Sequence, residues 1–286
     1  MAYDKYFLSE KKPEINPKEL KLIIKRALAE DIGKGDITTK ITIPKNKKVI
    51  AKIIAKEDFL LCGNFVAKSV FATIDPRVKF VEKIREGAQV KAQDIIAIIS
   101  GKATSILSGE RVALNLLALL SGVATKTYQF VKKITPYKTK ITDTRKTVTG
   151  LRELQKYAVR IAGGYNHRMR LDEMLLIKDN HLRLMGGYPK LPKIPKGYKV
   201  EMEAQSLNEF KHLLNFKPDI IMLDNMNISD MKKAVLIRAN LPILLEASGG
   251  INIGNIRKYA ATGVDIISVG ELTHSIKSVD ISLEII

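Results

Sequence analysis

Short apolar runs alternate with amphipathic stretches through the second half of the chain. These runs predict six strands, near Ile141 and at Met174–Ile177, Val200–Met202, Ile220–Leu223, Ile243–Leu245 and Ile266–Val269. After the third, fourth and fifth runs, apolar residues recur at the spacing of a helix, as at Leu207, Phe210 and Leu214. Alternating strands and helices are typical of a parallel sheet, so we expect an α/β barrel. Six predicted strands are two short of the usual eight.

The first half of the chain has a different pattern. A helix is expected between Asn16 and Gly33, because Asn16 can cap its start and Gly33 can close its end. Three β-like runs separated by turns follow, at Val49–Lys56, Val78–Ile84 and Ile95–Ser100. They predict a small α/β sandwich domain.

A long apolar stretch over residues 103–134 predicts a helix that links the two halves and is broken near Gly122. We therefore expect an N-terminal domain over residues 1–112, a barrel domain over 113–275 and a tail over 276–286 that packs back on the N-terminal domain.

Two connections between the predicted strands differ from each other. Between the first and second strands, Leu151, Leu154 and Ala158 recur at helical spacing and predict a crossover helix. Between the second and third, glycines and prolines over residues 185–197 argue against a helix. We expect a loop there, with an effect on the outer surface or on an oligomer contact.

Composition narrows the class of protein. Its 286 residues suffice for two domains, and 48 Lys plus Arg against 30 Asp plus Glu leave a formal charge of +18. The surplus is scattered, which indicates a solvated surface, and no arginine-rich run or RNA-binding aromatic motif favours nucleic acid. Cys62 is the single cysteine, so a cytoplasmic chain without a disulfide framework is expected. We expect neither a signal peptide nor a membrane span.

Cationic residues follow the first two predicted strands of the barrel. Arg145 and Lys146 come after the first strand and Lys178 after the second, with His167 and Arg168 in the connection between them. Because the carboxyl ends of parallel strands meet at one edge, these groups should converge on one ligand. So many potential cations predict a strongly anionic substrate.

Carboxylates and glycine turns follow the later strands. Glu203 and Asp224 lie on neighbouring predicted strands, where they could hold a magnesium-bearing sugar pyrophosphate, stabilise positive charge at a ribose carbon, or pair with Lys146 or Lys178. The turns at Ser248-Gly249-Gly250 and Gly270 could hold a phosphate through backbone N–H groups. His167 has no second histidine at metal-ligand spacing, which argues against a histidine metal site.

Several rare motifs occur in a fixed order along this region. TRKT is followed by GLR and KYAV, then NHR, then LIKDNH, and an ER pair at Glu110-Arg111 precedes them. In these motifs the chain resembles the quinolinate phosphoribosyltransferase family, also called nicotinate-nucleotide pyrophosphorylase (carboxylating).

The resemblance implies an open-barrel phosphoribosyltransferase that joins quinolinate to the ribose 5-phosphate of phosphoribosyl pyrophosphate, with Mg²⁺, and releases pyrophosphate and carbon dioxide. It implies a homodimer with shared active sites, or a hexamer. The residues that would hold the quinolinate carboxylates are Arg145, His167, Arg168, Lys178 and, from the neighbouring subunit, Arg111. Those for the phosphates, the ribose and the magnesium-bound substrate are Thr144, Lys146, Glu203, Asp224, Ser248, Gly249, Gly250, Ser268 and Gly270. Lys146, Lys178, Glu203 and Asp224 would be catalytic.

Two other readings explain part of the pattern. A molybdenum-associated paralogue, or a phosphoribosyltransferase for another aromatic acid, would share the fold, but the intact NHR and KDNH motifs argue against both. A basic nucleic-acid-binding protein would explain the charge, but not why cations and carboxylates recur at successive strand ends.

Overall fold

The computed structural model describes residues 13–187, 194 and 197–286. The chain divides into two compact units. The parallel-sheet unit contains Gln129–Thr147 and Gly164–Glu271. The N-terminal unit contains the described residues up to Tyr128, together with Val148–Gly163 and Leu272–Ile286.

The parallel-sheet unit is built on a six-stranded sheet with the order β6-β11-β10-β9-β8-β7. Its strands are β6 (Lys140–Thr142), β7 (Leu175–Ile177), β8 (Val200–Ala204), β9 (Ile220–Asp224), β10 (Leu244–Ser248) and β11 (Ile266–Ser268). All adjacent pairs are parallel, and β6 and β7 are the two ends of the order, so among the described residues no hydrogen-bonded ladder closes the sheet. The parallel α/β architecture expected from the apolar runs is confirmed, as is the open barrel that the family resemblance implies.

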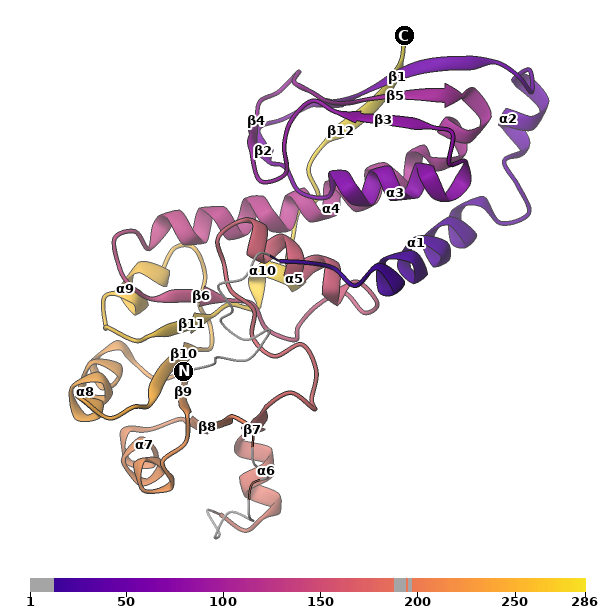
Figure 1. Cartoon of the computed structure of the whole chain (residues 1–286). Coiled ribbons are helices and arrows are strands. Elements are labelled where there is room, and N and C mark those ends of the chain that lie inside the picture. The colour runs from indigo at the N-terminus through magenta and orange to yellow at the C-terminus, as the bar shows by residue number, and fades with distance from the viewer. Residues whose placement is uncertain (1–12, 188–193, 195–196) are drawn as a thin grey trace. The chain divides into compact units, whose positions relative to one another are not determined.

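Helices connect the later strands and lie along one side of the sheet (Figure 1). They are α7 (Leu207–Leu213), the 3-10 turn η1 (Leu214–Phe216), α8 (Ile228–Arg238) and α9 (Ile256–Ala260). Local caps fix two of their starts: Ser206 accepts from the Glu209 N–H, and Asn227 accepts from the Asp230 N–H. Phe210 and Met231 are buried on these helices, as their spacing predicted.

The connection between β7 and β8 contains a short helix ahead of the expected loop. A short helix, α6 (Asp179–Leu184), begins directly after β7. The helix ends before the range 185–197 for which a loop was expected, and residues 185–187, 194 and 197 form no helix. Most of the proline-bearing stretch lies outside the described residues.

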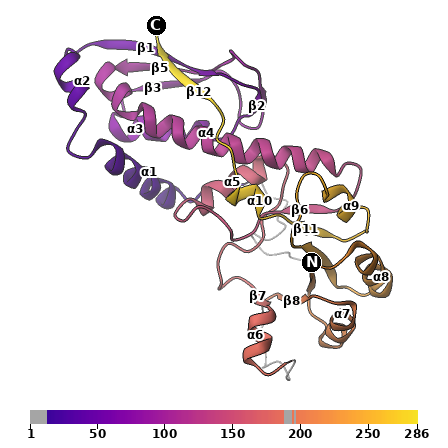
Figure 2. The same cartoon turned by 180° about the vertical axis from the view of Figure 1, so that it is seen from behind.

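The N-terminal unit contains a four-stranded antiparallel sheet with the order β12-β1-β5-β3. Its strands are β1 (Lys48–Ala55), β3 (Lys79–Glu82), β5 (Ile95–Lys102) and β12 (Ile281–Ile285). The three central runs were predicted, whereas the short pair β2 (Phe59–Leu60) and β4 (Gln89–Val90) was not. The last strand of the chain lies beside β1 (Figure 2), so the C-terminal tail completes this sheet.

From residue 13 onward, where the structure describes the chain, three helices precede the long one in this unit. They are α1 (Pro17–Ile32), α2 (Ile37–Thr42) and α3 (Asn64–Ile74). The predicted caps of α1 are present, since Asn16 accepts from the Lys18 N–H and Gly33 follows the last turn. Asp36 caps α2 by accepting from the Thr39 N–H at 2.9 Å, which gives Asp36 a structural role.

The long helix α4 (Ala103–Lys133) is continuous, so the break expected near Gly122 was wrong. Gly122 instead allows a close approach, because a Cβ atom there would collide with the carbonyl oxygen of Lys277. By length and hydropathy α4 could span a membrane, but 67% of its most apolar window is buried, as in the core helix of a globular protein.

The helix between the first two barrel strands, α5 (Arg152–Ile161), was correctly predicted but belongs to the N-terminal unit. Its Tyr157 ring packs edge-on against Phe65, with ring centroids 5.0 Å apart. Its buried Gln155 donates to the carbonyl of Thr273, next to α10 (Glu271–His274). These contacts anchor α5 in the N-terminal unit.

Candidate active site

One face of the parallel sheet collects four carboxyl groups from three adjacent strands. Glu203 and Glu246 each pair in register with Met222, the central residue of β9. Residues in register in a parallel sheet, and residues two apart on a strand, point to the same face. Glu201, Glu203, Asp224 and Glu246 therefore share that face, with Asp224 nearest the carboxyl ends of the strands.

Lys178 brings a cation to this face. It follows β7, and its Nζ lies 2.9 Å from Oε2 of Glu203. The Lys178 side chain is 43% exposed, whereas that of Glu203 is only 5% exposed. The lysine can therefore reach an incoming ligand while it neutralises a buried carboxylate. The structure thus joins two of the residues predicted from separate strand ends.

The segment that carries the NHR motif is tied to the end of β6. The backbone N–H of His167 donates to Oδ1 of Asp143 at 3.0 Å, and Asp143 is fully buried. The Arg168 guanidinium donates through Nη1 to the carbonyl of Met174 at 2.8 Å. Burial, followed by repulsion from the Arg145 guanidinium, lowers the pKa of Arg168. Two of the predicted substrate cations are therefore close enough to repel, as expected for groups that share an anionic ligand.

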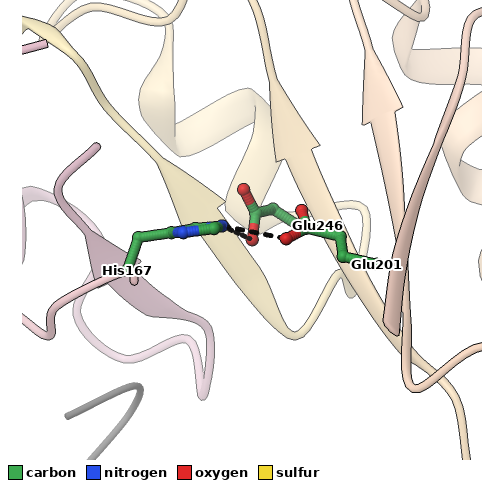
Figure 3. A group of neighbouring side chains, drawn as sticks. All are labelled: His167, Glu201 and Glu246. Carbon is green, nitrogen blue, oxygen red and sulfur yellow. Dashed lines mark ion pairs between the residues drawn. The ribbon is translucent and has the colours of Figure 1, made fainter. Parts of the chain in front are cut away.

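A buried cluster lies on the same face of the sheet, where the His167 ring meets Glu201 and Glu246 (Figure 3). Nε2 of His167 lies 3.0 Å from Oε2 of Glu201 and 3.6 Å from Oε2 of Glu246. Burial raises the pKa of Glu201 to about 8. Burial, followed by the charge of Glu201, raises the pKa of Glu246 to about 7. Loss of solvation therefore favours the protonated form of each carboxyl group.

The composition of this cluster raises the question of a metal ion, because one nitrogen and two carboxyl oxygens lie within 4.8 Å of one another. The hydrogen bonding of the ring argues against it. Nδ1 of His167 accepts from the Arg168 N–H at 2.8 Å, so a neutral ring carries its own proton on Nε2. A metal ligand shows the reverse arrangement, with a bare nitrogen toward the metal and an N–H on the far side. The cluster does not suit a metal ion.

The turn after β10 makes a close approach to the end of β9. Gly249 has a φ of +93°, and a Cβ atom there would lie 2.8 Å from the Asn225 nitrogen and collide with the Asn225 side chain. That side chain donates to Asp224 at 2.7 Å, and the Asn225 N–H donates to the Ser248 carbonyl at 2.9 Å. The glycine turn and the Asp224 carboxylate are thus held together.

Replacing Gly249 with alanine is expected to lower the free energy of unfolding by about 2–4 kcal/mol, from backbone strain and the clash with Asn225, and to displace Asp224. Gly250 is the matched control, since its φ is +60° but no atom lies within 4 Å of its virtual Cβ. Gly250→Ala should cost only about 1–2 kcal/mol of strain. Thermal unfolding and activity of both variants test this, and equal losses would contradict it.

The remaining predicted residues lie as follows. Thr144 accepts from the Lys146 N–H in the segment after β6, Ser268 ends β11 and is buried, and Gly270 follows two residues later. Arg111 is exposed on α4 and belongs to the N-terminal unit, so it is not among the groups that the parallel-sheet unit assembles. Its role as a residue of a neighbouring subunit stays a prediction.

Sequence reasoning gave no site role to Asp143, Glu201 and Glu246. Each is a fully buried carboxyl residue in or next to an apolar strand. Their position in the sequence is a signal that could have identified them, because burying an acidic residue within an apolar strand costs folding free energy unless the carboxyl group has partners. Which partners it has depends on the fold.

Both units match models of one protein family. The description "Quinolinate phosphoribosyl transferase, N-terminal domain" matches residues 36–121, and the corresponding C-terminal domain matches residues 123–284. The chain belongs to the quinolinate phosphoribosyltransferase family. The resemblance read from the TRKT, NHR and KDNH motifs is thereby confirmed.

Relatives of known name agree over nearly the whole length. A probable nicotinate-nucleotide pyrophosphorylase (carboxylating) of Synechocystis is 40% identical over 266 residues, which cover 91% of this chain and 90% of the relative. The solved structure of the nicotinate-nucleotide pyrophosphorylase from Francisella tularensis superposes with a TM-score of 0.91 at 39% identity, covering 97% of this chain and all of that one. That from Ehrlichia chaffeensis gives 0.89 at 39% identity, with coverages of 96% and 100%.

Proposed function

We propose that this chain transfers the phosphoribosyl group of phosphoribosyl pyrophosphate to quinolinate and decarboxylates the product, giving nicotinate mononucleotide, pyrophosphate and carbon dioxide. The observation that carries the proposal is the gathering, in a member of this family, of Lys178, Glu203, Asp224 and the Gly249 turn at one edge of a parallel sheet. Cations, carboxylates and backbone N–H groups are the three kinds of group that this pair of substrates requires.

The two carboxylates of quinolinate require cations in fixed positions. Arg145 and Arg168 repel each other in the free site, and a dianion between them would relieve that repulsion. Lys178 supplies a third positive charge from the next strand. Binding of the dicarboxylate thus neutralises charge that the fold has already gathered.

Phosphoribosyl pyrophosphate requires phosphate donors and a divalent cation. The turns at Ser248-Gly249-Gly250 and Gly270 offer backbone N–H groups, and Thr144 and Lys146 add side-chain donors. Mg²⁺ would arrive on the pyrophosphate, where it neutralises the leaving group, and Glu203 and Asp224 would face the magnesium-bound substrate. Both carboxylates lie on the required face of the sheet.

The chemistry then has two steps. The bond from ribose C1 to pyrophosphate breaks, the quinolinate ring nitrogen bonds to C1, and nearby carboxylates stabilise the positive charge that develops on the ribose. In the second step the carboxyl carbon beside the ring nitrogen leaves as carbon dioxide. Its bonding electrons remain on the ring next to the positive nitrogen, and a proton then replaces the carboxylate. The protein has to orient the substrates and neutralise their charge.

Release of carbon dioxide from quinolinate is the direct assay. Purified protein with phosphoribosyl pyrophosphate and Mg²⁺ should release carbon dioxide and form nicotinate mononucleotide in equal amounts, and omission of Mg²⁺ should abolish both. Absence of turnover in a folded protein with both substrates present would refute the proposal.

Nicotinate is expected to be a poor substrate, with kcat/KM at least about 100-fold below that of quinolinate. The site gathers Arg145, Arg168 and Lys178, and a monocarboxylate would leave part of this charge unpaired. Initial rates with both acids at saturating phosphoribosyl pyrophosphate test this. Comparable kcat/KM values for the two acids would show that the cations do not distinguish a dicarboxylate from a monocarboxylate.

The active protein is proposed to be a cytoplasmic homodimer, or a hexamer made of three such dimers, in which Arg111 of one chain completes the site of another. Support comes from the exposure of Arg111 on α4 and from its match to the ER motif of the family. The predicted absence of nucleic-acid and membrane partners belongs to the same proposal.

A further inference from the structure

His167 is held through three of its nitrogen atoms. Its backbone N–H donates to Asp143, its ring Nδ1 accepts from the backbone of Arg168, and its ring Nε2 faces Glu201 and Glu246. The three carboxyl groups come from the end of β6 and from the interiors of β8 and β10. The loop that carries Arg168 is therefore fastened to three separate strands of the sheet through one residue, His167.

The direction of the ring follows from these contacts. Because Nδ1 accepts a hydrogen bond from the Arg168 N–H, the proton of a neutral ring lies on Nε2 and points toward the two carboxyl groups. Figure 3 shows the ring directed at both of them. The reactive end of the imidazole is thus turned into the sheet, where it faces carboxyl groups at 3.0 and 3.6 Å.

Burying these two carboxyl groups costs free energy, because it removes them from water. Glu201 and Glu246 are fully buried, and the polar groups that face them in the described part of the chain are the His167 ring for both and the Ser268 hydroxyl for Glu246. An apolar side chain of similar volume in the centre of β10 would normally be more stable. A buried acid that lowers stability points to a role in function.

We propose that Glu246, acting with Glu201 through His167, is a positioning residue that sets the orientation of Arg168 toward the quinolinate carboxylates. The carboxyl groups fix the ring, and the ring fixes the backbone of Arg168 through Nδ1. This inference rests on the proposed function, because it assigns Arg168 to quinolinate. Glu246 need not touch substrate, and His167 acts here through its neighbour and not as a base or a metal ligand.

Two substitutions at position 246 distinguish a role in positioning Arg168 from a role in filling space in the core. Glu246→Met keeps the length but removes the polar atoms that face Nε2, and it should raise the KM for quinolinate by roughly 10-fold. The KM for phosphoribosyl pyrophosphate should stay within about 2-fold, and the melting temperature should not fall. Glu246→Gln keeps an acceptor for Nε2–H and should recover most of the quinolinate affinity.

The matched control is Met222→Leu. Met222 is buried on the strand between Glu201 and Glu246 and pairs in register with Glu246, but it contributes no carboxyl group. This variant should leave both KM values near those of the unmodified protein. If Glu246→Met changes the two KM values equally, or if Met222→Leu has the same effect, Glu246 only fills space and the inference is wrong.

The tautomer of the His167 ring can be measured on the unmodified protein, independently of catalysis. The chain has four histidines, so ¹⁵N labelling of histidine gives few signals, and His167→Gln identifies the one required. The expected signature is the neutral tautomer with its proton on Nε2, unchanged by one equivalent of Zn²⁺. An Nδ1–H tautomer, or a zinc-induced shift that Glu246→Met removes, would overturn the assignment.

Failure of the proposed function and failure of the positioning role of Glu246 give different results. If the unmodified protein does not turn over quinolinate, the proposed function fails, whatever the tautomer of His167. If it does turn over quinolinate and the tautomer or the KM pattern is wrong, only the positioning role of Glu246 fails.

Discussion

Lys178→Ala is expected to lower kcat/KM for quinolinate by at least about 100-fold without unfolding the protein. The Lys178 ammonium lies 2.9 Å from Glu203 and is exposed enough to meet a ligand. Its removal takes a cation from the anionic substrate and leaves the buried Glu203 carboxylate without its partner. Arg145→Ala should cause a loss of similar size.

A second lysine in the same sheet provides a matched control. Lys199 precedes β8, and its Nζ lies 2.7 Å from Asp219, which precedes β9, so this ion pair lies at the amino ends of the strands. Lys199→Ala removes the same kind of charge from the opposite edge of the sheet and should leave kcat/KM nearly unchanged. Circular dichroism of both variants establishes that they are folded. Full activity in folded Lys178→Ala would place the substrate elsewhere.

Arg111→Ala is expected to inactivate the protein as completely as Lys178→Ala, even though the parallel-sheet unit does not contain Arg111. The reason is the proposed dimer, in which each site takes Lys178 from one chain and Arg111 from the other. A heterodimer of the two inactive variants would carry both substitutions in one site and neither in the other. Its intact site should be fully active.

Refolding the two variants together tests this arrangement. Random reassortment of an equal mixture makes half of the dimers heterodimers. Each heterodimer has one intact site and one doubly substituted site, so about a quarter of the original activity should return. Each variant refolded alone serves as the control, and mass measurement of the mixture establishes subunit exchange. If exchange occurs and no activity returns, Arg111 does not act across an interface and is a solvated charge on α4.

Local patterns fixed most of the secondary structure of this chain. The apolar runs of the parallel sheet lie where β6 to β11 lie, and the caps of α1 are those that its flanking residues predicted. These features depend on spacing and on neighbours within a few residues, which a sequence displays directly. The motifs after the strands also identified the family, because they record the chemistry of the strand ends.

Contacts between residues far apart in the sequence decided structural features that local patterns did not predict. Gly122 was expected to break α4, but it lies in a continuous helix because the chain near Lys277 packs against it. Helix α5 lies in sequence between β6 and β7, yet its packing against Phe65 and Thr273 places it in the N-terminal unit. In each case the deciding neighbour is far away along the chain.

The same division applies to the site. The sequence by itself determined the fold class, the family and the alternation of cations and carboxylates at the strand ends. Only the tertiary structure paired Lys178 with Glu203 and placed Glu201 and Glu246 around the His167 ring. The physical reason is that the register of the sheet sets which side chains share a face, and burial sets their pKa values. Both depend on how distant strands pack, which local spacing does not record.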